Sequence, residues 1–339
     1  MINRNVSRKS ITNLMLISFA LGFSFVQTRI YAQTVNPVED PPPKSRESQE
    51  IIRVESELVT VPVTVLDRNG RYIANLIKEE FRVFENGTEQ EISSFEDVRS
   101  PVTVFLLLDV SGSLENRLSH VASAANQFIG RLHPDDQLIT AQFCGYIKML
   151  NKLSTVRDIK GKGLKLKSCG WTRLYDAVDF AFAKLNKISG RKAIILLSDG
   201  ADAGISARYP VAFVTEKDNY RLATESETLV YTVQFDTFAE RRYLCKQNAK
   251  QCEKDEATAR RYMETMPSIT GGKQIIVDRE ADLAKSFTEI ADELGHQYVL
   301  AYYPKLKPER GEKREIRVKV TRPGLAVRAR QSYVGGKTK

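Results

Sequence analysis

The stretch from Val102 to Ser113 restricts the fold more than any other part of this 339-residue chain. Its first seven residues, Val102 to Leu108, are large apolar or β-branched, which is typical of a strand buried on both faces. The run stops at Asp109, and Ser111 and Ser113 follow around a glycine. A carboxylate and two alternate hydroxyls therefore stand where a buried strand ends.

Such a set of oxygens suits a hard divalent cation. Mg²⁺ takes oxygen ligands in near-octahedral geometry and gives up water reluctantly. Open parallel sheets place their sites at the carboxyl ends of the strands, so the remaining ligands should follow other buried strands or lie beside them. Two oxygen donors meet this expectation: Thr172, within Trp-Thr-Arg-Leu-Tyr-Asp-Ala, and Asp199, which closes Ala-Ile-Ile-Leu-Leu-Ser-Asp-Gly.

These pieces together resemble the metal-ion-dependent adhesion site (MIDAS) of von Willebrand factor type A domains. They occur in the family's order, each beside the appropriate predicted element: Asp109-x-Ser111-x-Ser113, then Thr172 in Thr-x-Leu-Tyr-Asp-Ala, then Asp199-Gly200. The resemblance covers about residues 100 to 296, and the flanking regions resemble a subgroup of secreted bacterial proteins that carry such a domain. Trp171 departs from the pattern, because a small residue, usually glycine, commonly precedes the threonine.

The resemblance implies a role for each donor. Ser111 and Ser113 would coordinate Mg²⁺ or Mn²⁺ directly, and Thr172 would do so directly or through water. Asp109 and Asp199 would act mostly through water. Two neutral hydroxyls leave the cation electrophilic, so an acidic side chain of a protein partner would complete its coordination.

Strands and helices alternate between residues 100 and 296, which predicts a doubly wound, mostly parallel sheet covered on both faces. After the opening strand we expect a helix from Leu118 to Leu132, a strand from Gln137 to Phe143, an antiparallel edge strand from Tyr146 to Leu150, a helix from Leu174 to Ile188, strands at Ala193 to Leu197 and Leu229 to Phe235, a charged helix from Glu240 to Met266, a short strand through Ile276, and a helix from Leu283 to Leu294. Residues 201–227 receive no assignment.

The two ends of the globular region alternate at period two, as strands do. Residues 54–99 form an N-terminal β module, and residues 297–339 add three further strand patterns. About forty residues cannot easily make a stable sheet alone. We therefore expect the C-terminal extension to pack with the N-terminal module into one β sandwich flanking the α/β domain.

The amino terminus has the pattern of a secretory signal. Residues 1–32 combine a basic start, an apolar run and a plausible cleavage point after Ala32. Residues 33–53 are polar and proline-rich and predict an extended linker. Cleavage would lower the formal charge from +9 to +5, because the signal holds four basic residues and no acid. The prediction is a secreted or periplasmic protein without a membrane span, the alternative being a membrane tether formed by an uncleaved signal anchor; nucleic-acid binding is not expected.

Four cysteines lie beyond the signal, and export permits disulfides. We favour a bond between Cys144 and Cys169, both predicted near the metal face. Cys245 and Cys252 are seven residues apart in a helical pattern, which would separate them by about 10 Å. Either that helix breaks between them or they do not pair.

Several residues near the ligands have two readings. Asp176 and Asp202 are candidates to support the ligands, with capping and loop hydrogen bonds as the plainer role. Trp171 is either a partner anchor or a packing residue. The stretch from Lys148 to Arg173 contains eight basic residues and one acidic residue. This basic run is either a solvated face or a rim for an acidic partner. The residues of this candidate rim are Trp171, Lys165, Lys167 and Arg173.

We therefore expect a secreted or periplasmic, metal-dependent protein-binding or adhesion module that is not an enzyme. One alternative is a structural envelope scaffold whose β sandwich binds the partner. The other is a metal-assisted hydrolase, since a bound cation activates water. The absence of a histidine in the site segments, of a nucleophile elbow and of a second aspartate after Asp109 argues against hydrolysis. The sequence names no partner and no oligomeric state.

Overall fold

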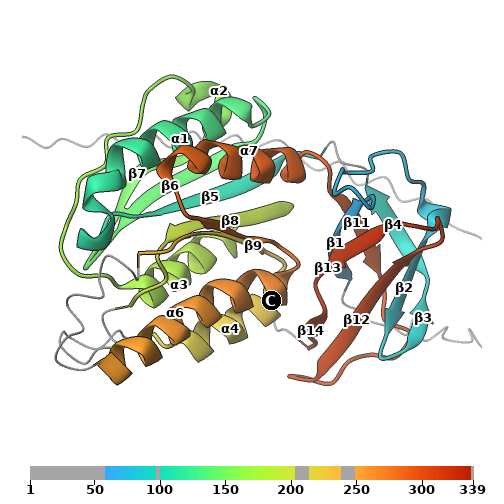
Figure 1. The fold of residues 1–339 in the computed structure, drawn as a ribbon. Helices are drawn as coiled ribbons and strands as arrows, with labels where there is room; N and C mark the ends of the chain where they lie inside the picture. The colour runs from blue at the N-terminus through green and yellow to red at the C-terminus, as the bar shows by residue number, and fades with distance from the viewer. Residues whose placement is uncertain (1–57, 97–99, 203–213, 238–248, 337–339) are drawn as a thin grey trace, which may run out of the picture. The chain divides into compact units, whose positions relative to one another are not determined.

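Six strands form the central sheet of the computed structural model, in the order β10-β9-β8-β5-β6-β7 (Figure 1). The structure describes residues 58–96, 100–202, 214–237 and 249–336. Only the β6–β7 pair is antiparallel. The strands are β5 (Val102–Asp109), β6 (Gln137–Phe143), β7 (Ile147–Thr155), β8 (Arg191–Ser198), β9 (Leu229–Phe235) and β10 (Gln274–Val277).

The strand β5 lies at the centre of this sheet, and all eight of its residues are buried. Its even-numbered side chains, such as Leu106, face one apolar cluster, while Phe105 and Leu107 face the other. Its register aligns Leu108 with Leu197 of β8, so Asp109 and the end of β8 reach the same edge of the sheet. The buried opening strand is thereby the element that sets the position of the site.

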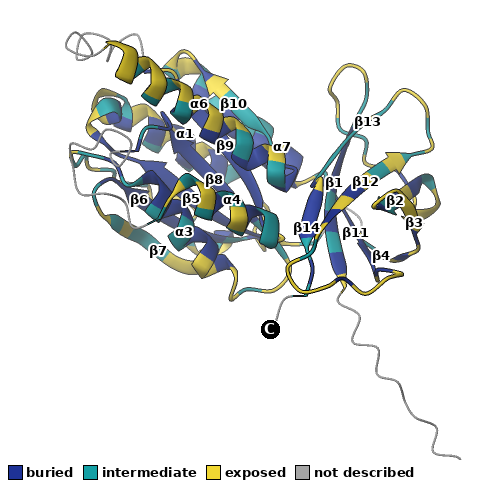
Figure 2. Cartoon of the chain, turned by 90° about the horizontal axis from the view of Figure 1, so that it is seen from below, coloured by how far each residue is buried: buried dark blue, intermediate teal, exposed yellow. Residues whose placement is uncertain are grey.

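Helices cover both faces of the sheet, which confirms the predicted fold class. Figure 2 shows the inner strands of the sheet in dark blue between helices whose outer sides are exposed. On one face lie α1 (Leu118–Arg131) and α7 (Leu283–Leu294), and on the other α3 (Leu174–Leu185), α4 (Glu216–Glu225) and α6 (Ala249–Thr270). Shorter helical segments are η2 (Gly112–Arg117), α2 (Val156–Ile159) and η5 (Glu280–Asp282).

Strands from both ends of the described chain interleave in a β sandwich, as the sequence predicted. One sheet has the order β13-β1-β11-β4 and the other β14-β12-β2-β3. Their shared core includes Val61, Val83 and Leu300, and each side chain is fully buried. The elements are β1 (Val59–Leu66), η1 (Lys78–Glu80), β2 (Phe81–Glu85), β3 (Thr88–Gln90), β4 (Ile92–Glu96), β11 (Tyr298–Tyr302), β12 (Lys313–Val320), β13 (Ala326–Ala329) and β14 (Ser332–Val334).

A buried carboxylate at the end of α7 connects the α/β domain to the sandwich. Glu293 accepts a hydrogen bond from the Tyr231 hydroxyl of β9 at 2.8 Å. It also accepts one from the Thr64 hydroxyl of β1 at 3.3 Å and pairs with Arg328 of β13. Burial and the Glu293 charge raise the pKa of Tyr231 well above its ordinary value, so this tyrosine stays a neutral donor.

Some predictions about the elements need correction, and others fall outside the described residues. The edge strand β7 continues to Thr155 instead of ending at Leu150, and Asn151 holds it to β6 by donating to the Leu138 carbonyl at 2.9 Å. The helix α4 occupies part of the segment left unassigned. The described part of α6 begins at Ala249 and continues through Pro267. The predicted signal, the linker and Cys245 lie outside the described residues.

Among the described residues, no helix has the length and apolar character needed to cross a membrane.

Candidate metal centre

Asp109 ends β5 in a fully buried position. One of its carboxylate oxygens accepts the backbone N–H of Ser111 at 2.8 Å, and the other accepts the Ser198 hydroxyl at 2.6 Å. Ser198 is the last residue of β8, so this bond joins two adjacent strand ends. Asp109 therefore fixes the turn that carries the two serines.

The hydroxyls of Ser111 and Ser113 lie 3.2 Å apart. Mg²⁺ holds oxygens at about 2.0–2.1 Å, so two neighbouring ligands of one octahedron are about 3 Å apart. The segment η2 carries Ser113, and Arg117 supports it by forming an ion pair with Glu280 at 2.9 Å. The observed spacing fits two adjacent ligands of one small cation.

The loop that carries Thr172 packs directly against the serine turn. Gly112 donates its N–H to the Gly170 carbonyl at 2.8 Å, and Cys169 donates to the Val110 carbonyl at 3.1 Å. A disulfide joins Cys169 to Cys144 at the end of β6, which is the pairing favoured from the sequence. The threonine is buried, and two backbone bonds and a covalent link hold its loop in place.

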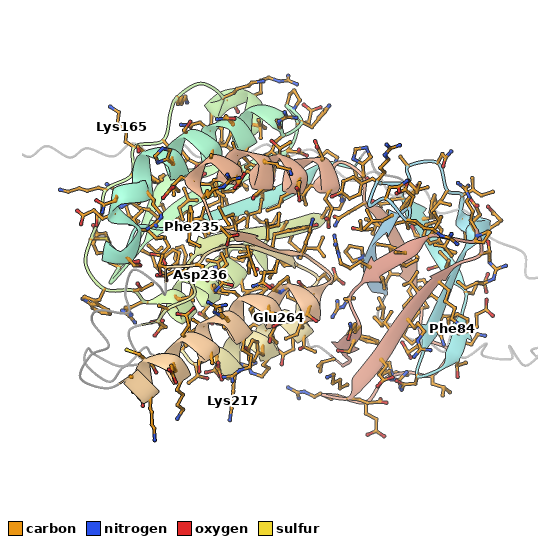
Figure 3. The ribbon with its side chains drawn as sticks, viewed as in Figure 1. Phe84, Lys165, Lys217, Phe235, Asp236 and Glu264 are labelled. Atoms are coloured by element: carbon orange, nitrogen blue, oxygen red, sulfur yellow. A yellow bond between two sulfur atoms is a disulfide. The ribbon has the colours of Figure 1, made fainter. Side chains whose placement is uncertain are left out.

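Asp199 follows β8 and is also buried. One carboxylate oxygen accepts the Ala201 N–H at 3.1 Å, and the other accepts the Thr237 hydroxyl at 2.8 Å. Thr237 lies two residues after β9, close to Phe235 and Asp236, which Figure 3 labels at this end of the sheet. The sequence reasoning missed Ser198 and Thr237, although a search for oxygen donors at the end of β9 would have found Thr237.

The two aspartates influence each other electrostatically. Burial, and then the neighbouring Asp199 carboxylate, raise the pKa of Asp109 to about 7. The described residues contain no cluster of three or more His, Cys, Asp or Glu side chains that could hold a metal. A donor set of hydroxyl and carboxylate oxygens instead fits Mg²⁺ or Mn²⁺.

A pH dependence follows from the raised pKa of Asp109. Without divalent ions, the folded state binds this proton more tightly than the unfolded state, whose carboxyl has a pKa of about 3.8. The free energy of unfolding should therefore fall as the pH rises from about 4 to about 7. Urea unfolding in EDTA at a series of pH values measures this decline. Asp109→Asn should lose this part of the decline, and saturating Mg²⁺ should suppress it in the wild type; identical pH profiles for both proteins in EDTA would exclude this cause.

Asp176 and Asp202 hold the α3 end of the threonine loop. Asp202 accepts the N–H groups of Leu174 and Tyr175 at 2.7 and 3.2 Å, which are first-turn donors of α3. Asp176 forms an ion pair with Arg173 at 2.8 Å. Through these bonds both carboxylates position the residues that follow Thr172.

The four residues of the candidate rim differ in their exposure and in their contacts. The Trp171 ring packs on Gly145, where an added Cβ would lie only 2.9 Å from the ring. Lys165 and Lys167 are exposed, and Lys165 projects from the surface in Figure 3. Arg173 is held by Asp176.

The position of the whole basic run needs correction. The pairing of Thr155 with Gln137 puts the last part of β7 at the opposite end of the sheet from Asp109. Arg157, which follows, forms an ion pair with Asp135 at 2.8 Å. Only part of the run therefore lies near the candidate metal centre.

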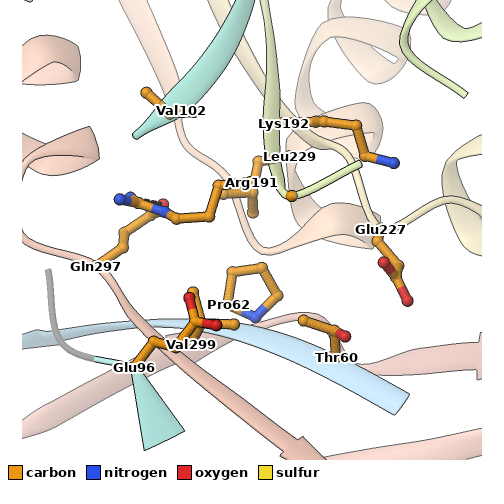
Figure 4. A pocket seen from close by; sticks show the side chains of 11 residues that line it. Thr60, Pro62, Glu96, Val102, Arg191, Lys192, Glu227, Leu229, Gln297 and Val299 are labelled. Atoms are coloured by element: carbon orange, nitrogen blue, oxygen red, sulfur yellow. Dashed lines mark hydrogen bonds between the residues drawn. The ribbon is translucent and has the colours of Figure 1, made fainter. Parts of the chain in front are cut away.

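A small pocket lies at that opposite end, where β5 and β8 begin (Figure 4). It has a volume of about 170 Å³. Arg191 points along it but is engaged, because it donates to the Ser100 and Leu294 carbonyls, both at 2.6 Å. The described pocket is thus separate from the candidate metal centre.

No protein-family model and no curated protein matches the chain. Among solved structures, it is similar to proximal thread matrix protein 1 from the mussel byssus, with 14% identity and a TM-score of 0.43 over 62% of this chain and 49% of that chain. A second structure of that mussel protein has a zinc-occupied MIDAS motif, with 13% identity and a TM-score of 0.43 over the same shares. A von Willebrand factor type A protein from Catenulispora acidiphila shows 12% identity and a TM-score of 0.42 over 83% of this chain and 75% of that one. The chain spans about half the length of the mussel protein.

Proposed function

We propose that this chain is a secreted or periplasmic binding module that holds a protein partner through Mg²⁺ or Mn²⁺ without catalysing a reaction. The observation that carries the proposal is the pairing of two buried carboxylates, Asp109 and Asp199, with two hydroxyls 3.2 Å apart. Two like charges in a buried place are unfavourable unless one carboxylate takes up a proton or a bound cation neutralises them, and near neutral pH a cation would favour the ionised pair.

The chain's own residues would hold the ion in the following way. The hydroxyls of Ser111 and Ser113, which lie within hydrogen-bond distance of each other, would bind it together with Thr172. Asp109 and Asp199 already accept hydrogen bonds from protein donors, which favours contact with the ion through water. When bound, the ion supplies a positive charge that attracts an acidic side chain of the partner.

The charges around the site favour an acidic partner as well. Lys165 and Lys167 are exposed on the loop that leads to Thr172. Positive charges around a site raise the association rate of a negatively charged partner and make it sensitive to salt.

The hydrogen bonds of the two aspartates also support a binding role over hydrolysis. A general base must present a carboxylate or imidazole to the water that it activates. Both oxygens of Asp109 and both of Asp199 accept protein hydrogen bonds. Among the described residues, both aspartates of the site are thus already engaged by protein donors, which favours a supporting role for them over that of a general base.

Partner capture with and without the metal tests the proposed function. The immobilised chain is incubated with a secreted or envelope protein fraction in Mg²⁺, then washed with EDTA. We expect bound partner to be released by EDTA, recaptured when Mg²⁺ is restored, and lost in Ser113→Ala. Ser123→Ala makes the same chemical change at an exposed position on α1 and should leave capture unchanged.

Two other outcomes would contradict the proposal. Capture that survives both EDTA and Ser113→Ala would indicate that the β sandwich binds the partner and that the α/β domain is a scaffold. A hydrolytic activity that copurifies with the chain and disappears in Ser113→Ala would indicate an enzyme.

A further inference from the structure

The strands β12 and β13 separate after the turn that joins them, because they belong to different sheets of the sandwich. Figure 1 shows their arrows spreading apart from this turn. The chain then returns as β14, which pairs with β12 only along Lys313–Glu315. Beyond Ile316, the second edge of β12 has no paired strand among the described residues.

The backbone of β12 shows which groups face this open edge. Ile316 donates its N–H away from β2, to the Gln331 carbonyl at 2.7 Å, whereas Thr321 donates to Glu80 on the β2 side. Alternate residues of a strand direct their backbone groups to the same side. Val318 and Val320 therefore direct their N–H and C=O groups away from β2, toward the unpaired edge of β12, and Val318 lines the gap between β12 and β13.

This gap is a groove of about 900 Å³, which lies within the size range of ligand-binding clefts. Its apolar part comes from half-buried residues such as Val318 and Val327, which also pack against the sandwich core. An unpaired edge with an apolar surface beside it is a template for strand addition. The groove therefore offers both backbone partners and apolar contact to an extended chain.

The charge along the groove is mainly positive. Its lining includes five basic residues and one acid, Glu315. Arg317 and Lys319 are exposed on the outer face of β12, and Lys319 lies over the Phe84 ring at 5.1 Å. Two further arginines are engaged within the structure: Arg328 pairs with Glu293 and Arg330 donates to the Ser332 and Thr224 carbonyls.

We propose that this groove binds an extended acidic segment of another protein, which adds to β12 as a further strand. Main-chain hydrogen bonds to Val318 and Val320 supply affinity, as in other strand-addition complexes. Successive side chains of a strand point to opposite faces of the sheet. The bound segment would therefore place small apolar residues toward the sandwich core and acidic residues beside Arg317 and Lys319. This binding surface is separate from the metal centre and does not depend on the function proposed above.

A designed peptide tests the proposal with the full chain. The probe is a synthetic ten-residue peptide in which valine and glutamate alternate, and the control replaces each glutamate with lysine. We expect the glutamate peptide to bind at least about tenfold more tightly than the control, and to slow hydrogen exchange of the Val318 and Val320 amides. Protection of neither amide at saturating peptide would overturn the proposal.

Charge exchange provides the second arm of the experiment. The double variant Arg317→Glu and Lys319→Glu should reverse the preference, so that it binds the lysine peptide in place of the glutamate peptide. Lys78→Glu reverses an exposed charge elsewhere in the sandwich and should leave the preference unchanged. An unchanged preference in the double variant, or loss of binding with EDTA, would contradict the proposed site.

A proline substitution separates strand addition from simple charge attraction. Val318→Pro removes one N–H that faces the groove, and proline is tolerated at such an edge position. Binding of the glutamate peptide should weaken in Val318→Pro but not in Val318→Thr. If sedimentation shows that the chain alone forms a dimer that Val318→Pro dissociates, the occupant is a second copy and the proposed partner is wrong.

Discussion

Replacing Glu293 by alanine is expected to lower the free energy of unfolding by about 3 to 5 kcal/mol. The Glu293 side chain is only 1% exposed, accepts the Tyr231 hydroxyl at 2.8 Å and pairs with Arg328. Its removal leaves the largely buried Arg328 charge without this partner. Loss of one member of a buried ion pair is costly because the remaining charge keeps its desolvation penalty.

A second glutamate on the same helix provides the matched control. Glu289 forms an ion pair with Lys273 at 3.1 Å, but the two side chains are 39% and 38% exposed. Glu289→Ala should therefore change the free energy of unfolding by less than about 1 kcal/mol. Urea denaturation followed by circular dichroism measures both variants. Equal losses in the two would show that the Glu293 contacts contribute no more than an exposed pair.

The Glu293 cluster also explains why the sandwich and the α/β domain should unfold together. Thr64 and Arg328 belong to the sandwich, while Tyr231 and Glu293 belong to the α/β domain. The wild type should show one cooperative transition. Glu293→Ala should keep one transition but shift it to a lower urea concentration, so that its free energy of unfolding can be compared with that of the wild type.

The fold was predictable where burial imposes a simple pattern. The apolar run of β5 predicted a strand covered on both faces, and the structure buries all eight residues. The polar residues at its end, which also suit a turn or a helix cap, predicted a site only in combination with Thr172 and Asp199. The sandwich was predictable because neither terminal region has enough strands to be stable alone.

Other features could not be predicted in this way, because they depend on contacts between side chains or strands. The hydrophobic periodicity of the sequence does not reveal such contacts. The helix α4 is mostly polar, and its clearest signal was the capping box of Thr215 and Asp218. Ser198 supports Asp109 from a neighbouring strand, so its role depends on the β5–β8 register. The basic run was read as one surface, yet the antiparallel course of β7 carries part of it to the other end of the sheet.

The open edge of β12 could not be predicted from the sequence either, because it depends on which strands pair. The alternation of Ile316, Val318 and Val320 predicted a strand with one buried face. It carried no information on which strands pair with it. The free edge arises because β13 joins the opposite sheet, a choice made by tertiary packing.

Titration of the purified chain with Mg²⁺ tests the central claim most directly. The free energy of unfolding is measured by urea denaturation in EDTA and at increasing Mg²⁺ for the wild type and Asp109→Ala. A site that binds only the folded state adds about 4 kcal/mol at a thousandfold excess over its dissociation constant. We expect this increase in the wild type and in Ser123→Ala, and its loss in Asp109→Ala. No increase in the wild type, or the same increase in Asp109→Ala, would contradict a metal centre at the end of β5.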